Sequence, residues 1–548
     1  MSHNFSDYQS ALTALSAYAE QIRQVVVDRT FADGKLDAKL ADQQQRVMHG
    51  YAWISAIETA LIAVLEWAER CESSGQFNEV EQLSLEIAYA EYLAQVIGGV
   101  AIGQNEIVRA SDYGLQRSVQ ELASDNAIQK LLGSGNTAEK RRALAEHCRD
   151  GHFPHEEFGD ELIDSARHQY RRYTENEIVP YAHQWHLDNA LIPDKTVNEL
   201  AEMGTFGVCI DEQFGGLGQG KLLMSVVTEE LSRGWISAGS LGTRSEIAGE
   251  LITLGGTAEQ QQYWLPKIAS GEVLPTAVFT EPDTGSDMGA LSTRAVSTDD
   301  GWLIKGNKTW ITHASRSDLM TLLARTKPDE KGYAGLSMFL VPKQRGDDAN
   351  VFPDAGLSGT EIEVLGYRGM REYELAFDDF SLNDDALLGG EQGRGFKQLM
   401  ETFEGARIQT AARAVGLARR AFELGLEYAL QRKQFGRPIF EFPRVSDKLA
   451  MTVIDILVSR ELTYFAAREK DKGQRCDIEA GMAKLIAARA AWASADASLQ
   501  IHGGNGYALE YEISRVLCDA RIMNIFEGAG EIQAQVIARG RLASKRAA

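Results

Sequence analysis

Hydrophobic residues in the first part of the chain are spaced for helices. One run recurs at three- and four-residue steps, which places its members on one helix face: Val47, Tyr51, Ile54, Ile57, Leu61 and Leu65. The segments LGSGNTAEKRR and RDGHFPHEEFGD then carry the Gly, Asn and Pro that interrupt helices, so we place a boundary near residue 155. We predict a helical extension over residues 1–155 and a second helical domain over residues 156–275.

The pattern changes to strands in the middle of the chain. Segments such as WLIKGNKTWIT, LMTLLART, GLSMFLVP and YELAFDDF are rich in β-formers and separated by Gly, Asp and Pro. Long helical periodicity returns with GFKQLMETFEGARIQTAARAVGLARRAF and continues to the end. The sequence therefore predicts a mostly α protein with a middle β-domain over residues 276–390 and a C-terminal helical domain over residues 391–548.

Composition narrows the class of protein. With 548 residues, 44% hydrophobic and 24% charged, the chain matches a soluble protein too large for one core. The formal charge of −22 argues against a nucleic-acid partner, and five scattered cysteines without a C-x-x-C argue against a metal site. The most apolar run, Tyr51–Trp67, is broken by polar residues, and the N-terminus MSHNFSDYQS lacks the features of a signal peptide. We expect a cytoplasmic protein with no membrane span.

Five segments are candidates for chemistry. AVFTEPDTGSDMGA (Ala277–Ala290) ends a strand and enters a turn whose N–H groups and hydroxyls suit phosphate or ribityl oxygens, although a plain polar hairpin has the same pattern. KTWITHA places Trp310 and Thr312 on one side of a strand, since residues two apart project to the same face. RKQFGRPI, QIHGGNGYALEYEISRVLCDAR and IFEGAGEIQ follow in order. The chain has no G-x-G-x-x-G unit between a strand and a helix, so any nucleotide cofactor binds in another way.

These motifs together resemble the acyl-CoA dehydrogenase family over roughly residues 160–545. The resemblance implies a helical domain, a β-barrel-like domain and a C-terminal four-helix bundle, with FAD as cofactor and an acyl-CoA thioester as substrate. It also implies electron-transfer flavoprotein as electron acceptor and a homodimer or homotetramer. The residues that it places against the flavin are Phe279, Thr280, Gly285, Ser286, Trp310 and Thr312, and Ser286 also against substrate. Those that it places against the ADP half of a neighbouring subunit's FAD are Arg432, Phe435, Gln500 and Gly504.

Glu527, in IMNIFEGAGEIQAQ, resembles the catalytic base of the family. Oxidation of a thioester needs a base that removes the α-proton while hydride leaves the β-carbon. We expect its apolar neighbours Met523 and Ile525 to desolvate the carboxylate and strengthen it as a base. An alternative role is a carboxylate at the N-terminus of the following helix. Glu531 is the other candidate carboxylate in this segment.

Two arginines are candidate substrate residues. Arg407 matches the family arginine near the thioester, or else pairs with Glu404 in a structural role. Arg244 lies in SLGTRSEIAGELI, on the expected acyl-pocket helix, where a buried guanidinium would need an anion such as a distal substrate carboxylate. The alternatives for Arg244 are a solvated position or a pair with Glu246.

The N-terminal extension bears on the substrate. Its length, with a chain that ends soon after the Glu527 helix, resembles family members that oxidise (2S)-methylsuccinyl-CoA to mesaconyl-CoA. Other short or branched acyl-CoA thioesters, oxygen as acceptor, and a DNA-associated flavoprotein of the same fold stay open as alternatives. The extension itself either covers a surface that would otherwise form tetramers or caps the CoA entrance.

Overall fold

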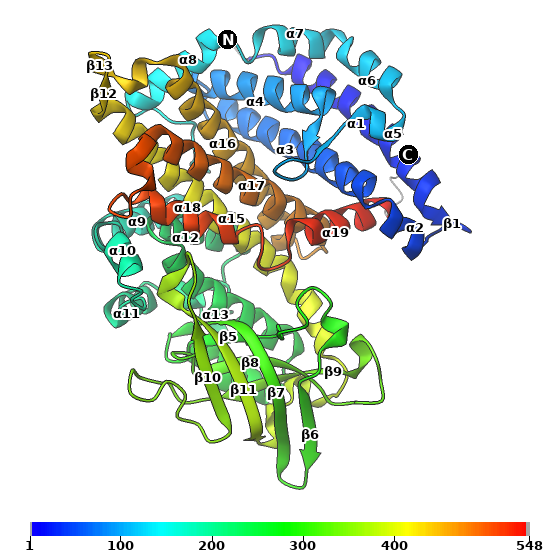
Figure 1. Cartoon of the computed structure of the whole chain (residues 1–548), viewed down its shortest axis with the longest axis vertical. Coiled ribbons are helices and arrows are strands. Elements are labelled where there is room, and N and C mark those ends of the chain that lie inside the picture. Colours follow the sequence, from blue (N-terminus) through cyan, green and yellow to red (C-terminus); the bar gives the residue numbers. More distant parts are fainter. Residues whose placement is uncertain (1–2, 544–548) are drawn as a thin grey trace. The chain divides into compact units, whose positions relative to one another are not determined.

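The computed structural model describes residues 3–543 (Figure 1). The chain forms two compact units. The bundle unit contains the described residues up to Ser165 and from Thr410 onward, and the sheet unit spans Ala166–Gln409. The long helix α15 (Gly395–Gln431) contributes to both.

The bundle unit is helical. Its N-terminal part contains α1 (Ser6–Thr30), α2 (Ala38–Gln43), α3 (Gln45–Ser73), α4 (Glu79–Gly98), α5 (Ala110–Tyr113), α6 (Gln116–Ala123), α7 (Asn126–Ser134) and α8 (Ala138–Arg149). Its C-terminal part adds α16 (Pro443–Asp471), α17 (Asp477–His502), α18 (Ile513–Ile522) and α19 (Gly530–Ala543). Asp125 and Thr137 cap α7 and α8 by accepting hydrogen bonds from backbone N–H groups of the first turn.

The N-terminal helices pack directly on the C-terminal ones. Helix α3 contacts α16, α17 and α19, and α8 contacts α16. The Tyr92 hydroxyl donates to Asp455 Oδ1 at 2.9 Å, and the Arg489 guanidinium lies 4.7 Å from the ring centroid of Trp53. The extension is therefore part of one core with the C-terminal helices.

Helix α3 is the central element of that core. Among residues 3–543 it is the helix that is long and apolar enough to cross a membrane, and 89% of its most apolar window is buried. A fully buried Trp67 donates its indole N–H to the carbonyl of His155 at 2.8 Å. Helix α3 is hydrophobic on nearly all sides, as expected of a helix that is enclosed by other helices.

The sheet unit combines helices with one sheet. The helices are the C-terminal part of α9 (Glu161–Tyr173), α10 (Val179–Leu187), α11 (Asp194–Glu202), α12 (Lys221–Gly234), α13 (Ile236–Gly255) and α14 (Ala258–Ala269). The strands are β5 (Pro275–Val278), β6 (Arg294–Thr298), β7 (Gly301–Thr312), β8 (Leu319–Arg325), β9 (Leu336–Pro342), β10 (Leu357–Ile362) and β11 (Glu372–Leu382). Figure 1 shows these strands together in green. The predicted fold class, mostly α with a middle β-domain, is confirmed.

The strands form a sheet of order β10-β11-β7-β6-β8-β5, with β9 paired to β8. Most neighbours are antiparallel, whereas β5 and β6 run parallel to β8. Alternation along β8 divides the core: Met320 and Leu322 belong to the cluster on one sheet face, and Leu319 and Leu323 to the cluster with α13 and α14. The sheet is buried on both faces around β8, which fixes the register of the strands that hold the site.

Candidate active site

The segment TEPDTGSD forms a tight turn directly after β5. The backbone groups of Glu281 and Thr284 bond to each other in both directions, at 2.9 and 3.0 Å. Beyond this pair, Gly285 and Ser286 are exposed at the tip, and a side chain built on Gly285 would meet nothing within 4 Å. The turn is closed at its base and offers open N–H and hydroxyl groups at its tip.

A buried lysine fixes the base of this turn. Lys308, on β7, is fully buried, and its Nζ donates to the carbonyls of Phe279 and Leu323 at 2.8 and 2.9 Å and to Glu281 Oε1 at 3.0 Å. Burial alone would raise the pKa of Glu281, but the Lys308 ammonium and hydrogen bonds from Thr293 and its neighbour outweigh it and lower the pKa to about 2. Glu281 is therefore an ionised structural anchor, and it holds Phe279 and the turn in place.

A β-bulge interrupts β7 at Thr309 and Trp310, just before Thr312. Ile311 pairs with Tyr373, but Lys308 pairs with Leu375, so the register between β7 and β11 shifts at this point. Trp310 adopts a φ of 58°, and its side chain is 56% exposed, whereas Thr312 is 7% exposed. The regular alternation that the sequence argument assumed is interrupted here, so the shared strand face is not what relates these two residues.

Strained backbone gathers where β7 ends and β11 begins. Trp310, His313, Tyr367 and Arg371 all have φ between 53° and 64°, in the left-handed region that non-glycine residues avoid. Such conformations cost free energy and persist where the surrounding structure imposes them, typically at functional sites. The observation marks this end of the sheet as a candidate site independently of any motif.

Arg244 lies at this same end of the sheet unit. Its Nη2 is 3.4 Å from Thr312 Oγ1 and 3.4 Å from the Tyr367 hydroxyl. The Thr312 hydroxyl lies 2.9 and 3.0 Å from the two carboxylate oxygens of Glu372. Burial raises the pKa of Glu372 to about 8, although Arg244 and the Thr312 hydroxyl favour its ionised form. A guanidinium and a carboxyl group thus share one buried hydroxyl next to the bulge.

One alternative for Arg244 is wrong. The residue is 9% exposed, so it does not lie on a solvated face. Glu246 accepts a hydrogen bond from Lys221 at 2.5 Å, and the same Nζ donates to Glu250 at 2.8 Å. Helices α12 and α13 are thereby tied by a buried ionic cluster that includes Glu246, two residues after Arg244.

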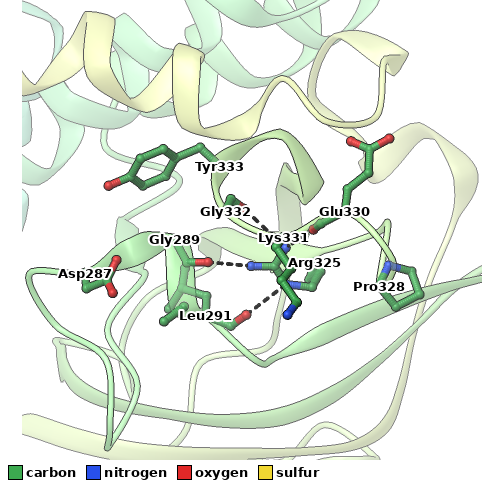
Figure 2. Close-up of a pocket in the computed structure, with 10 residues that line it drawn as sticks. Asp287, Gly289, Leu291, Arg325, Pro328, Glu330, Lys331, Gly332 and Tyr333 are labelled. Atoms are coloured by element: carbon green, nitrogen blue, oxygen red, sulfur yellow. Dashed lines mark hydrogen bonds between the residues drawn. The ribbon is translucent and has the colours of Figure 1, made fainter.

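A pocket of about 490 Å³ opens beside the turn formed by TEPDTGSD (Figure 2). Its lining residues are Asp287, Gly289, Ala290, Leu291, Arg325, Pro328, Glu330, Lys331, Gly332 and Tyr333. The Arg325 guanidinium donates to the carbonyls of Gly289 and Leu291 at 2.8 and 3.0 Å, which shapes the floor. Lys331 is exposed. Asp287, the last residue of the TEPDTGSD turn, also lines the pocket. The pocket is therefore continuous with this turn within the sheet unit.

In the bundle unit, Glu527 is held by helix α15. Arg413 Nη2 lies 2.8 Å from both carboxylate oxygens of Glu527, and the Thr410 hydroxyl also bonds to Oε2. Arg413 is fully buried, whereas the Glu527 side chain is 15% exposed. The sequence analysis considered only apolar neighbours of Glu527, whereas the structure adds a guanidinium, and a guanidinium in contact with a carboxylate stabilises its ionised form. The helix-dipole alternative is also not what is seen, since α19 begins three residues later, at Gly530.

The backbone around Glu527 is as tightly fixed as its carboxylate. Glu527 has a φ of 52° and Gly528 a φ of 88°. Gln533 Nε2 donates to the carbonyls of both residues at 3.1 and 3.2 Å, and the buried Lys484 donates to Gly528 O at 2.7 Å. A Cβ on Gly528 would lie 2.2 Å from Gln533 Nε2, so only glycine fits. Glu531, the other candidate, is exposed in the first turn of α19.

The four residues predicted to reach a neighbouring subunit's FAD are all exposed in the bundle unit: Arg432, Phe435, Gln500 and Gly504. Phe435 is at the tip of the hairpin β12–β13 (Lys433–Gln434 and Arg437–Pro438), 92% exposed, with a φ of 51°. Tyr428, at the end of α15, stacks on His502 with ring centroids 4.2 Å apart. This contact joins the end of α15 to the end of α17. Tyr507, five residues after His502, is also 92% exposed.

Arg407 lies on the sheet-unit part of α15. It is partly exposed, and its guanidinium carbon is 5.8 Å from the ring centroid of Phe403. Its role near a thioester stays a prediction, and so does the alternative pair with Glu404.

Sequence reasoning missed three residues that organise these sites: Arg413, Glu372 and Lys308. A signal existed for Arg413, since a lone arginine in the Ala-rich helical run TAARAVGLA raises the same question as Arg244 did. Lys308 lies between Asn307 and Thr309, and Glu372 lies at the start of a strand, so both resemble ordinary solvated positions in the sequence. Their burial depends on which strands flank them, which spacing alone does not specify.

The fold and these sites define a thioester dehydrogenase of the acyl-CoA dehydrogenase class. Three family models match the chain: the acyl-CoA dehydrogenase N-terminal domain over residues 161–272, the middle domain over 276–380 and the C-terminal domain over 393–542. The chain belongs to the acyl-CoA dehydrogenase family, as the motifs predicted.

Individual relatives refine this result. A (2S)-methylsuccinyl-CoA dehydrogenase from Cereibacter sphaeroides is 55% identical over 533 residues, which cover 96% of each chain. The solved "Structure of the glutaryl-coenzyme A dehydrogenase glutaryl-CoA complex" is 30% identical with a TM-score of 0.66, and covers 71% of this chain and 97% of its own. A chain in "Electron transferring flavoprotein of Acidaminococcus fermentans: Towards a mechanism of flavin-based electron bifurcation" is 29% identical with a TM-score of 0.66, and covers 71% of this chain and 100% of its own.

Proposed function

We propose that the protein oxidises (2S)-methylsuccinyl-CoA to mesaconyl-CoA. The observation that carries the proposal is the 55% identity to an enzyme of that name over 96% of both chains. That span includes most of the N-terminal extension, which lies outside the three family models. The likeness therefore extends to the region that sets this chain apart within its family.

We propose FAD as the cofactor, and the residues present fit it. The exposed tip at Gly285 and Ser286 offers an N–H and a hydroxyl with free space around them, and Trp310 offers an exposed aromatic ring. Phe279, Thr280 and Thr312 complete the set proposed for the flavin end. When bound, FAD would accept the hydride that leaves the substrate β-carbon.

Glu527 is proposed as the base that removes the α-proton. Its carboxylate is held ionised by Arg413 and remains 15% exposed, so it is both charged and reachable. The backbone N–H of the same residue is a candidate donor to the thioester oxygen, where negative charge develops as the proton leaves. The rigid conformation of Glu527 and Gly528 favours such preorganisation.

Arg244 is the residue proposed for the distal carboxylate of the substrate. A buried guanidinium supplies the strong charge-assisted hydrogen bonds that a carboxylate needs away from water. Arg407 and Ser286 are proposed to contact the thioester and CoA portions.

We further propose that the protein works as an oligomer of identical chains and passes its electrons to electron-transfer flavoprotein. Exposed Phe435 and Tyr507 give the bundle unit an apolar surface suited to a second copy and its FAD. Helices α3 and α8 cover α16, α17 and α19, which favours a dimer over a tetramer built through that face. Light scattering on the purified protein distinguishes the two.

An anaerobic titration tests the proposed function. The purified protein is mixed with (2S)-methylsuccinyl-CoA, butyryl-CoA or isobutyryl-CoA, and oxidised-flavin absorbance is followed. We expect rapid bleaching with methylsuccinyl-CoA alone. Bleaching only by the monocarboxylic thioesters would retain the reaction type and reject the substrate, whereas a preparation that carries no flavin would reject the cofactor.

A further inference from the structure

Arg413 contacts both oxygens of the Glu527 carboxylate directly, which a base in an apolar pocket would not need. One guanidinium nitrogen lies 2.8 Å from each carboxylate oxygen and 2.8 Å from Thr410 Oγ1. Thr410 and Arg413 are three residues apart on α15, so they project from the same helix face. The guanidinium carbon of Arg413 also lies 5.0 Å from the ring centroid of Phe526. The arginine is thus fixed by its own helix and by the residue next to the base.

Other charged groups near this segment lie on different helices. Lys484 on α17 donates to the Gly528 carbonyl rather than to the carboxylate, and Glu531 on α19 is exposed. Arg413 contacts the Glu527 carboxylate directly, with Nη2 2.8 Å from Oε2. A carboxylate that accepts two charged hydrogen bonds keeps its negative charge to lower pH than a free one.

We propose that Arg413 is a positioning residue that keeps Glu527 ionised and aimed until the α-proton arrives. The proposal rests on the proposed role of Glu527 as base. It assigns to α15 a function beyond packing: the helix sets the acidic limit of activity through one guanidinium. During the step, the substrate α-C–H bond breaks and its proton passes to a Glu527 oxygen, while the electron pair left on carbon forms the α,β double bond as hydride leaves the β-carbon for the electron acceptor of the proposed reaction. The Arg413 contacts to that oxygen weaken as its negative charge is neutralised.

The test is the pH dependence of kcat/KM for the holoenzyme with (2S)-methylsuccinyl-CoA. For Arg413→Lys and Arg413→Met we expect the acidic limb to move to higher pH, by about one unit or more for the methionine variant. Relative to wild type, kcat/KM then falls about tenfold or more at low pH and recovers as pH rises. A ratio of variant to wild type that stays constant at every pH would overturn the proposal and leave Arg413 a purely structural residue.

Arg420→Gln is the matched control. Arg420 lies on the same helix and pairs with both oxygens of Glu512 at 2.9 and 2.7 Å, within the bundle unit. We expect this variant to lower the unfolding temperature without moving the acidic limb. A shift as large as that of Arg413→Met would show that the limb reports general loss of ion pairs, and would overturn the specific role.

A thermal measurement provides a readout that needs no turnover. Arg413→Met leaves a carboxylate without its guanidinium, so we expect a lower unfolding temperature than in wild type. In the double variant Arg413→Met with Glu527→Gln that charge is absent, so we expect the two losses to be less than additive. Strict additivity would contradict a direct coupling between the two groups.

Two further arms separate the possible failures. If Glu527→Gln retains turnover, the proposed base is wrong, whatever the Arg413 variants do. If Glu527→Gln is inactive but the Arg413 profiles match wild type, the base stands and the positioning role fails.

Discussion

The two units hold their candidate functional groups by different means. In the sheet unit, backbone geometry dominates: a tight turn after β5 that buried Lys308 anchors, a bulge at Trp310 and a cluster of left-handed residues. In the bundle unit, side chains dominate: Arg413 and Thr410 from one helix hold a single carboxylate. A surface that receives a large planar ligand needs a shaped backbone, whereas a proton-transfer group needs a controlled charge. The difference predicts that the two sites fail in different ways.

The largest effect is expected at the carboxylate of the bundle unit. Glu527→Gln removes the proton acceptor and keeps the shape, so we expect kcat to fall by roughly 10²–10⁴-fold with the flavin absorbance retained. Stopped-flow bleaching with methylsuccinyl-CoA measures it. Glu531→Gln, exposed on α19, is the control and should turn over like wild type. Near-normal turnover of Glu527→Gln would move the base elsewhere.

The sheet unit is expected to fail through stability instead. Lys308→Met leaves Glu281 buried without its cation and frees the Phe279 carbonyl, which should cost about 3–5 kcal/mol of unfolding free energy. Urea denaturation measures the loss. Lys305→Met serves as the control, because Lys305 lies on the same strand as Lys308 and forms an exposed ion pair with Asp379 of β11. Equal stability of the two variants would show that the turn does not depend on the buried lysine.

Glu372 offers a pH test within the sheet unit. Its pKa of about 8 lies above the usual value of 4.5, so its contribution to stability is complete below pH 4.5 and is lost as pH rises through 8. The difference in unfolding free energy between wild type and Glu372→Gln should therefore change across this range, with a slope approaching about 1.4 kcal/mol per pH unit. Denaturation at several pH values measures it. A difference that stays flat would mean that Glu372 is ionised beside Arg244 throughout.

The smallest effect is expected at the exposed hairpin. Phe435→Ala changes a side chain that is 92% exposed, so the unfolding free energy of the isolated chain should hardly change. If the residue contacts a partner subunit's FAD, flavin retention should weaken by roughly tenfold, or about 1.4 kcal/mol. Equilibrium dialysis measures the flavin affinity, and unchanged affinity would remove Phe435 from the proposed cofactor site.

Motifs and hydrophobic periodicity were sufficient to predict the order of helical and strand regions, the family and several candidate residues. Helical spacing predicted the extension, alternating strands predicted the middle domain, and the TEPDTGSD and FEG segments predicted where Ser286 and Glu527 would matter. These features are local, because caps, turns and hydrophobic periods are determined by residues close together in the chain. Family membership followed from the same local patterns, and the comparisons confirmed it.

The sequence alone determined the fold class and the family, and it predicted Glu527 as the base. Only the tertiary structure decided what surrounds the candidate residues: a guanidinium at Glu527, a bulge rather than regular alternation at Trp310, and a shared hydroxyl between Arg244 and Glu372. Each of these joins residues 60 or more positions apart, or depends on how two strands register. Electrostatic environment and strand register are set by long-range packing, which the spacing of residues along one segment does not encode.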